Sequence, residues 1–425
     1  MREKSTLLIS LLFLCLLTAC TENTGTSEAG DNQEEKPQGS IDLDIWVMGA
    51  DDYWRSYHDD LANRFEEKHN NITINIDYIP WDEGENKLVT TAANDRLPDI
   101  TTVAGRWTPQ LAAMGAFEPL DQFIDTDFKE SFVEAPWETT QYEDQTWGLP
   151  VGFTTTGLFY RSDWLEEQGF TSPPETWEEF VEVAKSFTTD NQYGFGLVGY
   201  NGMETTMFWA PFLWSNGGDF LTEDLQQAAF NSNEGVEALE FYTDLLRKHS
   251  VAPEGSVNND RTDSRDLFIT ETVGMTTQGP WLPKFIEEGA PELEYEIAPY
   301  PVKKEAVNLG TVDHIAMTKQ ATHKEESWKF IEFFTNKEND MKWAQHQGFI
   351  PYHKENLDRD DRRNTKEFEV FFEVAPDAKA YPTIPEWPQI DQAIAEAIQE
   401  TLMGVKSPQE ALDEAADEVN QLLSK

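Results

Sequence analysis

The residues of this chain that could do chemistry are first of all its carboxylates, its histidines and its two cysteines. The familiar catalytic patterns are absent from the 425-residue sequence: it has no Gly-x-Ser-x-Gly elbow, no His-Glu-x-x-His, no P-loop and no Cys-x-x-Cys. The seven histidines are scattered without metal-ligand spacing. The stretch from Asp260 to Glu271 has acids at both ends, but Arg265 stands where a calcium loop needs glycine. We therefore expect no catalytic residue, no metal site and no cofactor.

Tryptophans at the ends of predicted elements form the second group of candidate residues. The chain has 14 tryptophans, and several of them stand beside glycine, proline or asparagine at predicted loop positions. A tryptophan at the end of an element is typical of a binding platform, whereas one within a helix stripe is typical of a core. The pattern therefore favours a binding role for some of these tryptophans and core packing for the others.

Acidic residues outnumber basic residues by 79 to 32, which gives a net charge of −47. Nucleic acid is excluded as a partner, because neutralising its phosphates needs clustered cations. The acids are spread through the whole chain rather than gathered in one tail. We interpret this spread as a halophilic surface for a salty or alkaline exterior, where screening weakens self-repulsion. A merely acidic secreted protein is the alternative.

The first 40 residues have the pattern of a leader and a tether. Two basic residues precede an apolar run at 7–17, which suits a signal peptide and is short for a membrane span. The run ends in LTAC at 17–20, which resembles the bacterial lipobox, and this resemblance implies that Cys20 is lipidated and becomes the mature N-terminus. Residues 20–40 are too poor in apolar side chains to fold, so they would form a disordered tether. An ordinary signal peptide with a chance cysteine is the alternative.

Removal of residues 1–19 would leave 406 residues with a net charge of −48, because this leader carries two cations and one anion. Such a length exceeds one ordinary core, so two domains are expected. An acylated Cys20 would be the last cysteine, which leaves no thiol for a disulfide or for a thiolate metal site. The exported body would therefore be held together by its cores alone.

Apolar periodicity predicts an α/β body after residue 40. Apolar side chains alternate over 41–47 and 72–78, which predicts strands, and recur every four residues over 53–65, which predicts an amphipathic helix. This strand–helix–strand order is typical of a parallel sheet covered by helices. Capping boxes at Thr176 and Ser407, and a similar pair at Asn231 and Glu234, predict the starts of three later helices.

The chain also resembles a known family through six short stretches that occur in a fixed order. They are PWDEGENKLVTTAANDRLPDITTV (80–103), GLPVGFTTTGLFYRSDWL (148–165), WSNGGDF (214–220), FNSNEGVEALEFYTDLL (230–246), TTQGPWLPKF (276–285) and QGFIPYHKEN (347–356). Together they resemble the extracellular solute-binding proteins of bacterial sugar ABC transporters, the family that includes the maltose-binding protein. The resemblance covers nearly the whole chain after residue 40.

This resemblance implies a two-lobed periplasmic-binding-protein-like fold of type II, with the ligand in a cleft between two α/β lobes joined by hinge crossovers. By position, the crossovers are expected near Val151-Gly152, near 306–309 and near 351–355. The expected N-terminal lobe is 41–151 with 308–352, and the expected C-terminal lobe is 152–307 with 353–425.

Candidate ligand contacts follow from the resemblance and from the chemistry of sugars. A pyranose has apolar C–H faces and a rim of hydroxyls, so aromatic rings bind it together with carboxylates, amides and guanidinium groups. Trp281, in a Gly-Pro-Trp stretch, matches the family's cleft tryptophan most closely, with core packing as its alternative. One of Trp209 and Trp214 is expected to line the cleft, and the other to pack in the core.

The remaining candidates stand in predicted loops and crossovers. They are Asp51 after the first strand, Trp81 after a strand-ending proline, Arg106 and Trp107 after the third strand, Phe153 after the first crossover, Asp313 at the second, Tyr352 at the third and Trp387 in a proline-rich loop. Asp51 could equally be a solvated surface residue, and Trp81 a core residue. Asp313 and His314 depart from the small apolar residues that the family has there, so this pair would be a specificity contact or a local cap.

The resemblance implies a binding protein that captures a carbohydrate, in the first place an oligosaccharide, and delivers it to the permease subunits of an ABC transporter. It would act as a monomer and without chemistry, at the extracellular face of the cytoplasmic membrane of a Gram-positive-type cell, and only its lipid anchor would touch the membrane. Two alternatives stay open. One is a lipid-anchored glycoside hydrolase, because 79 acids make chance carboxylate pairs plentiful. The other is a binding protein for another solute, such as a glycerophosphodiester.

Overall fold

The computed structural model describes residues 39–425, so the predicted leader, the lipidation site at Cys20 and nearly all of the predicted tether lie outside the described residues. Residues Ser40–Lys425 form a compact unit. Within this part of the chain, no helix is both long enough and apolar enough to cross a membrane. Its helices surround two main sheets, which confirms the predicted α/β organisation.

The first sheet has five strands in the order β2-β1-β3-β12-β6. β1 pairs in parallel with β2 and β3, whereas β12 runs antiparallel to β3 and β6. The strands are β1 Ile41–Met48, β2 Ile72–Ile79, β3 Ile100–Ala104, β6 Leu149–Thr154 and β12 Thr311–Met317, with a small hairpin of β4 Gln141–Tyr142 and β5 Gln145–Thr146. The accompanying helices are α1 Asp52–Lys68, α2 Trp81–Ala92, α3 Thr108–Ala113, α4 Thr126–Glu130, α5 Glu134–Glu138, α12 Lys324–Thr335, α13 Lys337–Gln347 and α14 Lys354–Arg359. We call these elements the first lobe.

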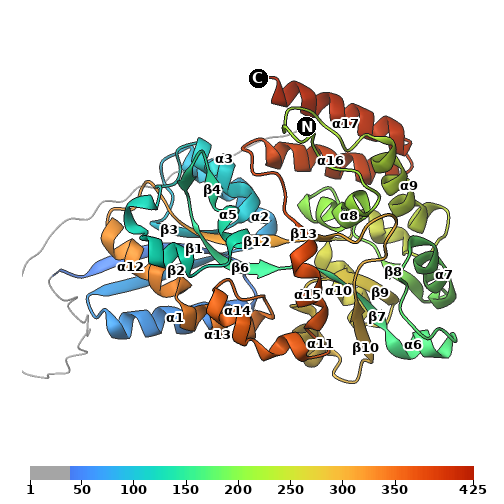
Figure 1. The fold of residues 1–425 in the computed structure, drawn as a ribbon, viewed down its shortest axis with the longest axis horizontal. Coiled ribbons are helices and arrows are strands. Elements are labelled where there is room, and N and C mark those ends of the chain that lie inside the picture. Colours follow the sequence, from blue (N-terminus) through green and yellow to red (C-terminus); the bar gives the residue numbers. More distant parts are fainter. Residues whose placement is uncertain (1–38) are drawn as a thin grey trace, which may run out of the picture. The chain divides into compact units, whose positions relative to one another are not determined.

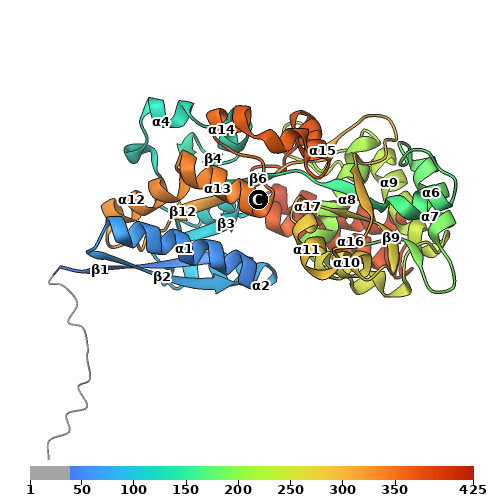
Figure 2. The ribbon, with the colours of Figure 1, turned by 90° about the horizontal axis from the view of Figure 1, so that it is seen from below.

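The first lobe folds as its apolar pattern predicts. The alternating residues Leu43, Ile45 and Val47 of β1 are buried, and α1 packs Leu61 and Phe65 into the same apolar cluster. Burial of such side chains stabilises the fold by about 1.5–3 kcal/mol each. α1 contacts α12 and α13, and the three helices lie together in Figure 2.

The second sheet has four strands in the order β10-β7-β9-β8. β7 is antiparallel to β10 and β9, whereas β8 and β9 are parallel. The strands are β7 Gly157–Arg161, β8 Tyr193–Gly196, β9 Val273–Gln278 and β10 Tyr295–Ala298. The accompanying helices are α6 Ser162–Glu167, α7 Trp177–Phe187, α8 Met203–Ser215, α9 Asn233–Arg247, α10 Arg261–Ile269, α11 Leu282–Gly289, α15 Glu369–Val374, α16 Trp387–Leu402 and α17 Pro408–Leu423. We call these elements the second lobe.

Capping and burial fix the helices of the second lobe. Two of the three predicted capping pairs are confirmed: Thr176 and Glu179 cap α7, and Ser407 and Glu410 cap α17. The pair at Asn231 and Glu234 is one residue too early, because Ser232 caps α9. α16 and α17 lie side by side in Figure 1 and bury their apolar faces in one large cluster together with α8 and α9. α8 is buried along almost its whole length, which is expected of a helix packed between other elements.

The chain passes three times between the two sheets. β6 pairs with β12 up to Thr154, and β7 begins at Gly157, so the first passage is residues 155–156, later than the predicted Val151-Gly152. Figure 1 shows β6 leading directly from one lobe to the other. The second passage runs through β11, Asn308–Leu309, which pairs with β13, Ala378–Lys379, just before β12.

The predicted third crossover at 351–355 is too early. The backbone N–H of Lys354 donates to Ser131 at 3.0 Å, and the Asn356 amide donates to Lys337 at 2.7 Å, so α14 stays on the first lobe. The second lobe is reached just before α15, because Lys366 pairs with Glu296 of β10 and Phe371 packs with Phe159 of β7. The passage therefore comes after α14, since the first turn of this short helix is bound to first-lobe partners.

Candidate functional site

A small cavity lies where elements of the two lobes meet. Its lining residues come from both: Gly105, Arg106, Thr139, Gly310, Thr311, Val312, Ala380, Tyr381, Pro382 and Thr383. The cavity volume is about 30 Å³, which is room for roughly two water molecules. Any ligand as large as a sugar ring therefore requires the two lobes to move apart before it can enter.

Arg106 reaches this cavity from a 3₁₀ turn, Gly105–Trp107, that directly follows the fully buried strand β3. A side chain at position 105 would place its Cβ 2.4 Å from the carbonyl oxygen of Val312, so only glycine lets the turn pass this close to β12. The Arg106 guanidinium lies over the ring of Tyr381 at 5.6 Å, with its Nε 4.0 Å from the Asp391 carboxylate, and it contacts the sulfur of Met203. These three partners belong to the second lobe.

His314 forms a hydrogen bond with Thr139, one of the residues that line the cavity. Its Nδ1 lies 2.8 Å from the hydroxyl of Thr108 and its Nε2 lies 2.9 Å from the hydroxyl of Thr139. Thr139 donates its own proton to the carbonyl of Pro136, so Nε2 must donate to Thr139 and Nδ1 must accept from Thr108. Burial lowers the pKa of His314 to about 3, which keeps the ring neutral and both bonds intact. The two residues of the predicted pair at 313–314 therefore have different roles. His314 is a structural residue, whereas Asp313 interacts with the charges of Arg106 and Arg261.

Three carboxyl groups near Arg106 hold their protons more tightly than usual. Burial raises the pKa of Asp313 to about 7 and that of Asp391 to about 7, and it raises the pKa of Glu85 as well. The positive charge of Arg106 opposes the rise in all three cases. Perturbed carboxyls that gather in a cleft are typical of functional sites.

A second arginine, Arg261, lies over Trp281, the tryptophan that was predicted to line the cleft. The Arg261 guanidinium lies 4.9 Å from the centre of the Trp281 ring, and its Nε donates to Glu204 at 2.9 Å. The indole N–H of Trp281 donates to Gln278 at 3.0 Å. Trp281 is partly buried and packs against apolar clusters of both lobes, so it stands at their interface.

The structure brings four of the predicted site residues near this interface. Trp107 is 1 % exposed and packs in a first-lobe apolar cluster with Leu111, so it is a core residue, although the Arg106 guanidinium lies 5.6 Å from its ring. The ring of the half-buried Trp81 lies 6.0 Å from that of Trp107. Arg106, Asp313 and Trp281 complete the group. Phe153 belongs to a small cluster with Val312 and Ile350 beside the cavity. The contact of any of them with a ligand remains a prediction.

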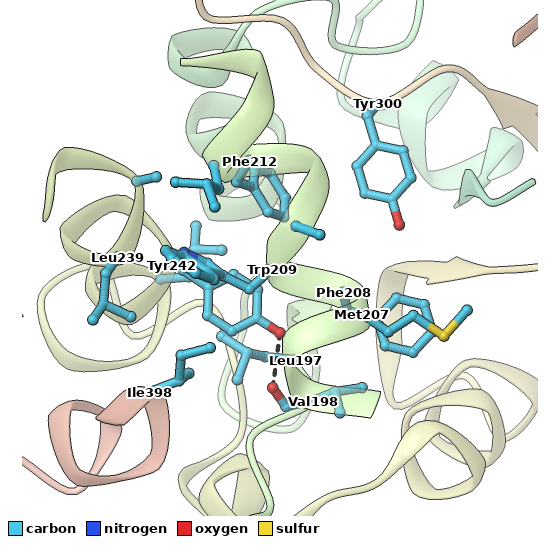
Figure 3. Packing of buried hydrophobic residues seen from close by; sticks show 14 of the residues in the cluster. Leu197, Val198, Met207, Phe208, Trp209, Phe212, Leu239, Tyr242, Tyr300 and Ile398 are labelled. Carbon is cyan, nitrogen blue, oxygen red and sulfur yellow. Dashed lines mark hydrogen bonds between the residues drawn. The ribbon is translucent and has the colours of Figure 1, made fainter. Parts of the chain in front are cut away.

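Trp209, Trp214 and Trp387 occupy the core of the second lobe rather than a cleft surface. All three are at most 1 % exposed, and their rings surround Phe220 at 6.2, 5.4 and 5.0 Å. Figure 3 shows Trp209 packed among apolar side chains that include Leu197 and Ile398. The expectation that Trp209 or Trp214 lines the cleft is therefore wrong for this structure, because α8 has packed neighbours on all its faces.

Two further candidates have structural partners. Tyr352 is 2 % exposed and its ring stacks on Phe132 at 5.9 Å, so it is a core residue of the first lobe and not a cleft residue. Asp51 is exposed and caps α1, because its carboxylate accepts the backbone N–H of Trp54 at 2.8 Å. The cap explains an aspartate at this position without a ligand.

Sequence reasoning missed four residues that the fold adds to the site: Glu85, Arg261, Tyr381 and Asp391. The clearest signal was Asp391, because it falls within the apolar stripe of α16 between Ile390 and Ile394, where an unpaired acid is costly. Glu85 and Arg261 stand in polar stretches and Tyr381 stands in a proline-containing loop, so these three carry no such signal.

The site lacks a metal-binding arrangement, since the described residues contain no group of three or more histidine, cysteine or acidic side chains that could hold an ion.

Comparisons with known proteins agree with this geometry. A sequence model of the bacterial extracellular solute-binding proteins matches residues 53–341. A putative binding protein of Brucella abortus is 30% identical over 374 residues, 87% of this chain and 90% of that protein. The sn-glycerol-3-phosphate-binding periplasmic protein UgpB of Escherichia coli is 25% identical over 406 residues, 86% of this chain and 89% of that protein.

Solved structures show the same architecture. An ABC transporter solute-binding protein of Thermotoga lettingae, bound with α-D-tagatose, has a TM-score of 0.85 and 30% identity, and the match covers 90% of this chain and 100% of that chain. The maltose-bound MalE3 protein of T. maritima has a TM-score of 0.83 and 23% identity, with the same coverage. These matches confirm the two-lobed fold.

Proposed function

Because the chain belongs to the bacterial extracellular solute-binding protein family, we propose that it captures a carbohydrate in the cleft between its lobes and delivers it to an ABC transporter permease. One observation carries the ligand class. The buried atoms Arg106 Nε, Asp391 Oδ1 and Tyr381 Oη have no hydrogen-bond partner among the described residues, and they lie beside aromatic rings. Unpaired polar atoms are costly in an interior, so a ligand that pairs with them would be held strongly.

A sugar suits this combination of groups. Its hydroxyls can donate to a carboxylate such as Asp391 and accept from a guanidinium such as Arg106, while its C–H faces pack on rings such as Tyr381 and Trp281. The relatives bound with tagatose and maltose support this ligand class. The three passages between the sheets would act as hinges, so that closure of the lobes removes the ligand from water.

The proposal places the protein outside the cytoplasmic membrane, held by a lipid on Cys20 and by residues 20–40 as a tether. The support is the lipobox-like LTAC at 17–20 and the polar composition that follows it. Delivery to permease subunits, a monomeric state and the absence of catalysis are parts of the same proposal. Their support is membership of a family of substrate-binding proteins.

A thermal-shift screen at high salt tests the ligand class. Oligosaccharides and monosaccharides would be added to the full-length protein, and a ligand present at about 100 times its dissociation constant should stabilise it by roughly 2.7 kcal/mol. Recovery of each glycan unchanged after incubation would support binding without catalysis, whereas cleavage products would support the hydrolase alternative. A screen in which no glycan stabilises the protein would contradict the carbohydrate proposal.

A further inference from the structure

Two arginines and four acids from both lobes gather around the cleft. They are Glu85 on α2, Arg106 and Asp313 of the first lobe, and Glu204 on α8, Arg261 on α10 and Asp391 on α16 of the second lobe. With every group ionised, the carboxylates outnumber the guanidinium groups. In that ionised state, which the raised pKa values of Asp313 and Asp391 place above about pH 7, this group of side chains is negative independently of the acidic surface of the rest of the chain.

The opposite charges meet across the interface between the lobes. Arg106 of the first lobe faces Asp391 of the second, with 4.0 Å between Nε and Oδ2. Asp313 of the first lobe interacts with the charges of both Arg106 and Arg261, and Arg261 belongs to the second. Arg261 is in addition paired with Glu204 at 2.9 Å. Each guanidinium thus lies near a carboxylate when the lobes are together, although only Arg261 makes a hydrogen bond to its acid and the Nε of Arg106 makes none.

The unpaired atom of Asp391 indicates which ligand groups fit. Asp391 is 4 % exposed, and its Oδ1 has no hydrogen-bond partner among residues 39–425. An ionised carboxylate only accepts hydrogen bonds, so it needs an O–H or N–H donor opposite it. A phosphate or carboxylate oxygen offers a lone pair instead, and two acceptors with like charge repel each other in a buried site.

We infer that Asp313 and Asp391 make the cleft reject anionic ligands, so that it takes hydroxyl-bearing ligands without negative charge. This inference rests on the proposed function and narrows its ligand class. It separates the chain from its glycerol-phosphate-binding relative and argues against the glycerophosphodiester alternative. Arg106 alone would suggest an anion site, but the carboxylate of Asp391 beside it offsets its positive charge, while its Nε stays available to donate to a ligand hydroxyl.

Small anions of known structure test the inference without knowledge of the natural ligand. We would measure binding of sn-glycerol 3-phosphate and glucose 6-phosphate by calorimetry, with glycerol and glucose as uncharged counterparts, at constant ionic strength. A pH of 8.5 keeps the cleft carboxyls ionised. The wild-type protein should show no saturable binding of either anion. The double variant Asp313→Asn/Asp391→Asn should bind sn-glycerol 3-phosphate saturably, with a dissociation constant at least about tenfold below the highest concentration at which wild type shows no binding, because two like charges near the anion are gone.

Control variants distinguish an effect of the cleft carboxylates from a general effect of removing negative charge. Asp417→Asn makes the same chemical change on the exposed face of α17 and should leave anion binding absent. Adding Arg106→Gln to the double variant should abolish the gain, which locates the anion at this guanidinium. If the double variant does not fold, Asp391→Asn alone should give a smaller gain of the same sign.

Two results would overturn the inference: saturable anion binding by wild type that is lost in Arg106→Gln, or a folded Asp→Asn variant without any gain. A failure of the glycan screen would count against the carbohydrate proposal only, since the anion measurements decide the charge selection by themselves.

Discussion

Replacing Trp281 by alanine would separate a binding role from a packing role for the tryptophan at the interface between the lobes. The ring contacts clusters of both lobes, carries the Arg261 guanidinium at 4.9 Å and donates one hydrogen bond to Gln278. A central aromatic anchor typically costs about 2 kcal/mol or more on truncation. The dissociation constant of the glycan found in the screen should therefore rise by roughly 30-fold or more.

The cost to stability should be smaller than the cost of emptying a core. The lost hydrogen bond contributes about 1 kcal/mol and the cation–π contact about 0.5–1 kcal/mol. The partly buried position lets solvent fill the space that the indole leaves. We therefore expect a decrease of about 2 kcal/mol in the free energy of unfolding without ligand, measured by chemical denaturation.

Trp209→Ala is the matched control, because it removes the same side chain from a fully buried site. There the loss should be about 3–5 kcal/mol, since a cavity remains in a closely packed cluster. Isothermal titration calorimetry gives the dissociation constant of each variant, and denaturation gives its free energy of unfolding. A binding role predicts the larger loss of affinity for Trp281→Ala, and a packing role predicts the larger loss of stability for Trp209→Ala. The reasoning is refuted if Trp281→Ala binds the glycan as tightly as wild type, or if it loses as much stability as Trp209→Ala.

Three further predictions concern the anchor, salt and protons. The mature protein should begin at a diacylglyceryl Cys20 and fractionate with membranes, and Cys20→Ala should release it or block its maturation; mass spectrometry that finds an unmodified cysteine or another cleavage site would contradict this. The melting temperature should rise clearly between millimolar and molar salt, because screening weakens repulsion in a chain with a net charge of −47, and a flat curve would contradict the halophilic interpretation. Burial raises the pKa of Asp391 from 3.8 to about 7, so the folded protein holds this proton more tightly than the unfolded chain does. The stability that protonated Asp391 contributes is complete below about pH 4 and is lost as the pH rises through about 7. The free energy of unfolding of Asp391→Asn should therefore increase relative to that of wild type over this range. Denaturation curves of the two proteins that differ by the same amount at pH 4 and pH 8 would show that Asp391 is not buried in this way.

The elements of the fold were predictable because the local spacing of apolar and capping residues shows where each element begins and which face of it is buried. Leu43, Ile45 and Val47 alternate and are all buried, and the capping box at Thr176 begins a helix where it was expected. The crossovers were harder to locate. α14 continues on the first lobe through hydrogen bonds to Ser131 and Lys337, and Ser131 is far from it in sequence.

The site was predictable only in part, for a related reason. Arg106 and Trp281 follow strand ends, a local feature that points to the edge of a sheet and so to the interface. Whether a tryptophan faces a cleft or a core depends instead on what packs against it. Trp209 and Trp214 stand on α8, which packs against the next helix, α9, and against α16 from a distant part of the chain, and the local sequence does not indicate that these helices cover it.

The sequence by itself determined an acidic two-lobed α/β body and its family, and it predicted an exported-type leader and Arg106 as a site residue, because composition, periodicity and short motifs are local properties of the chain. Only the tertiary structure decided which charges meet in the cleft. Arg106 and Asp391 lie 4.0 Å apart but belong to different lobes, and their pairing depends on how the lobes close. The raised pKa values of Asp313 and Asp391 follow from the same event, because burial and the field of a distant arginine exist only once the chain has folded.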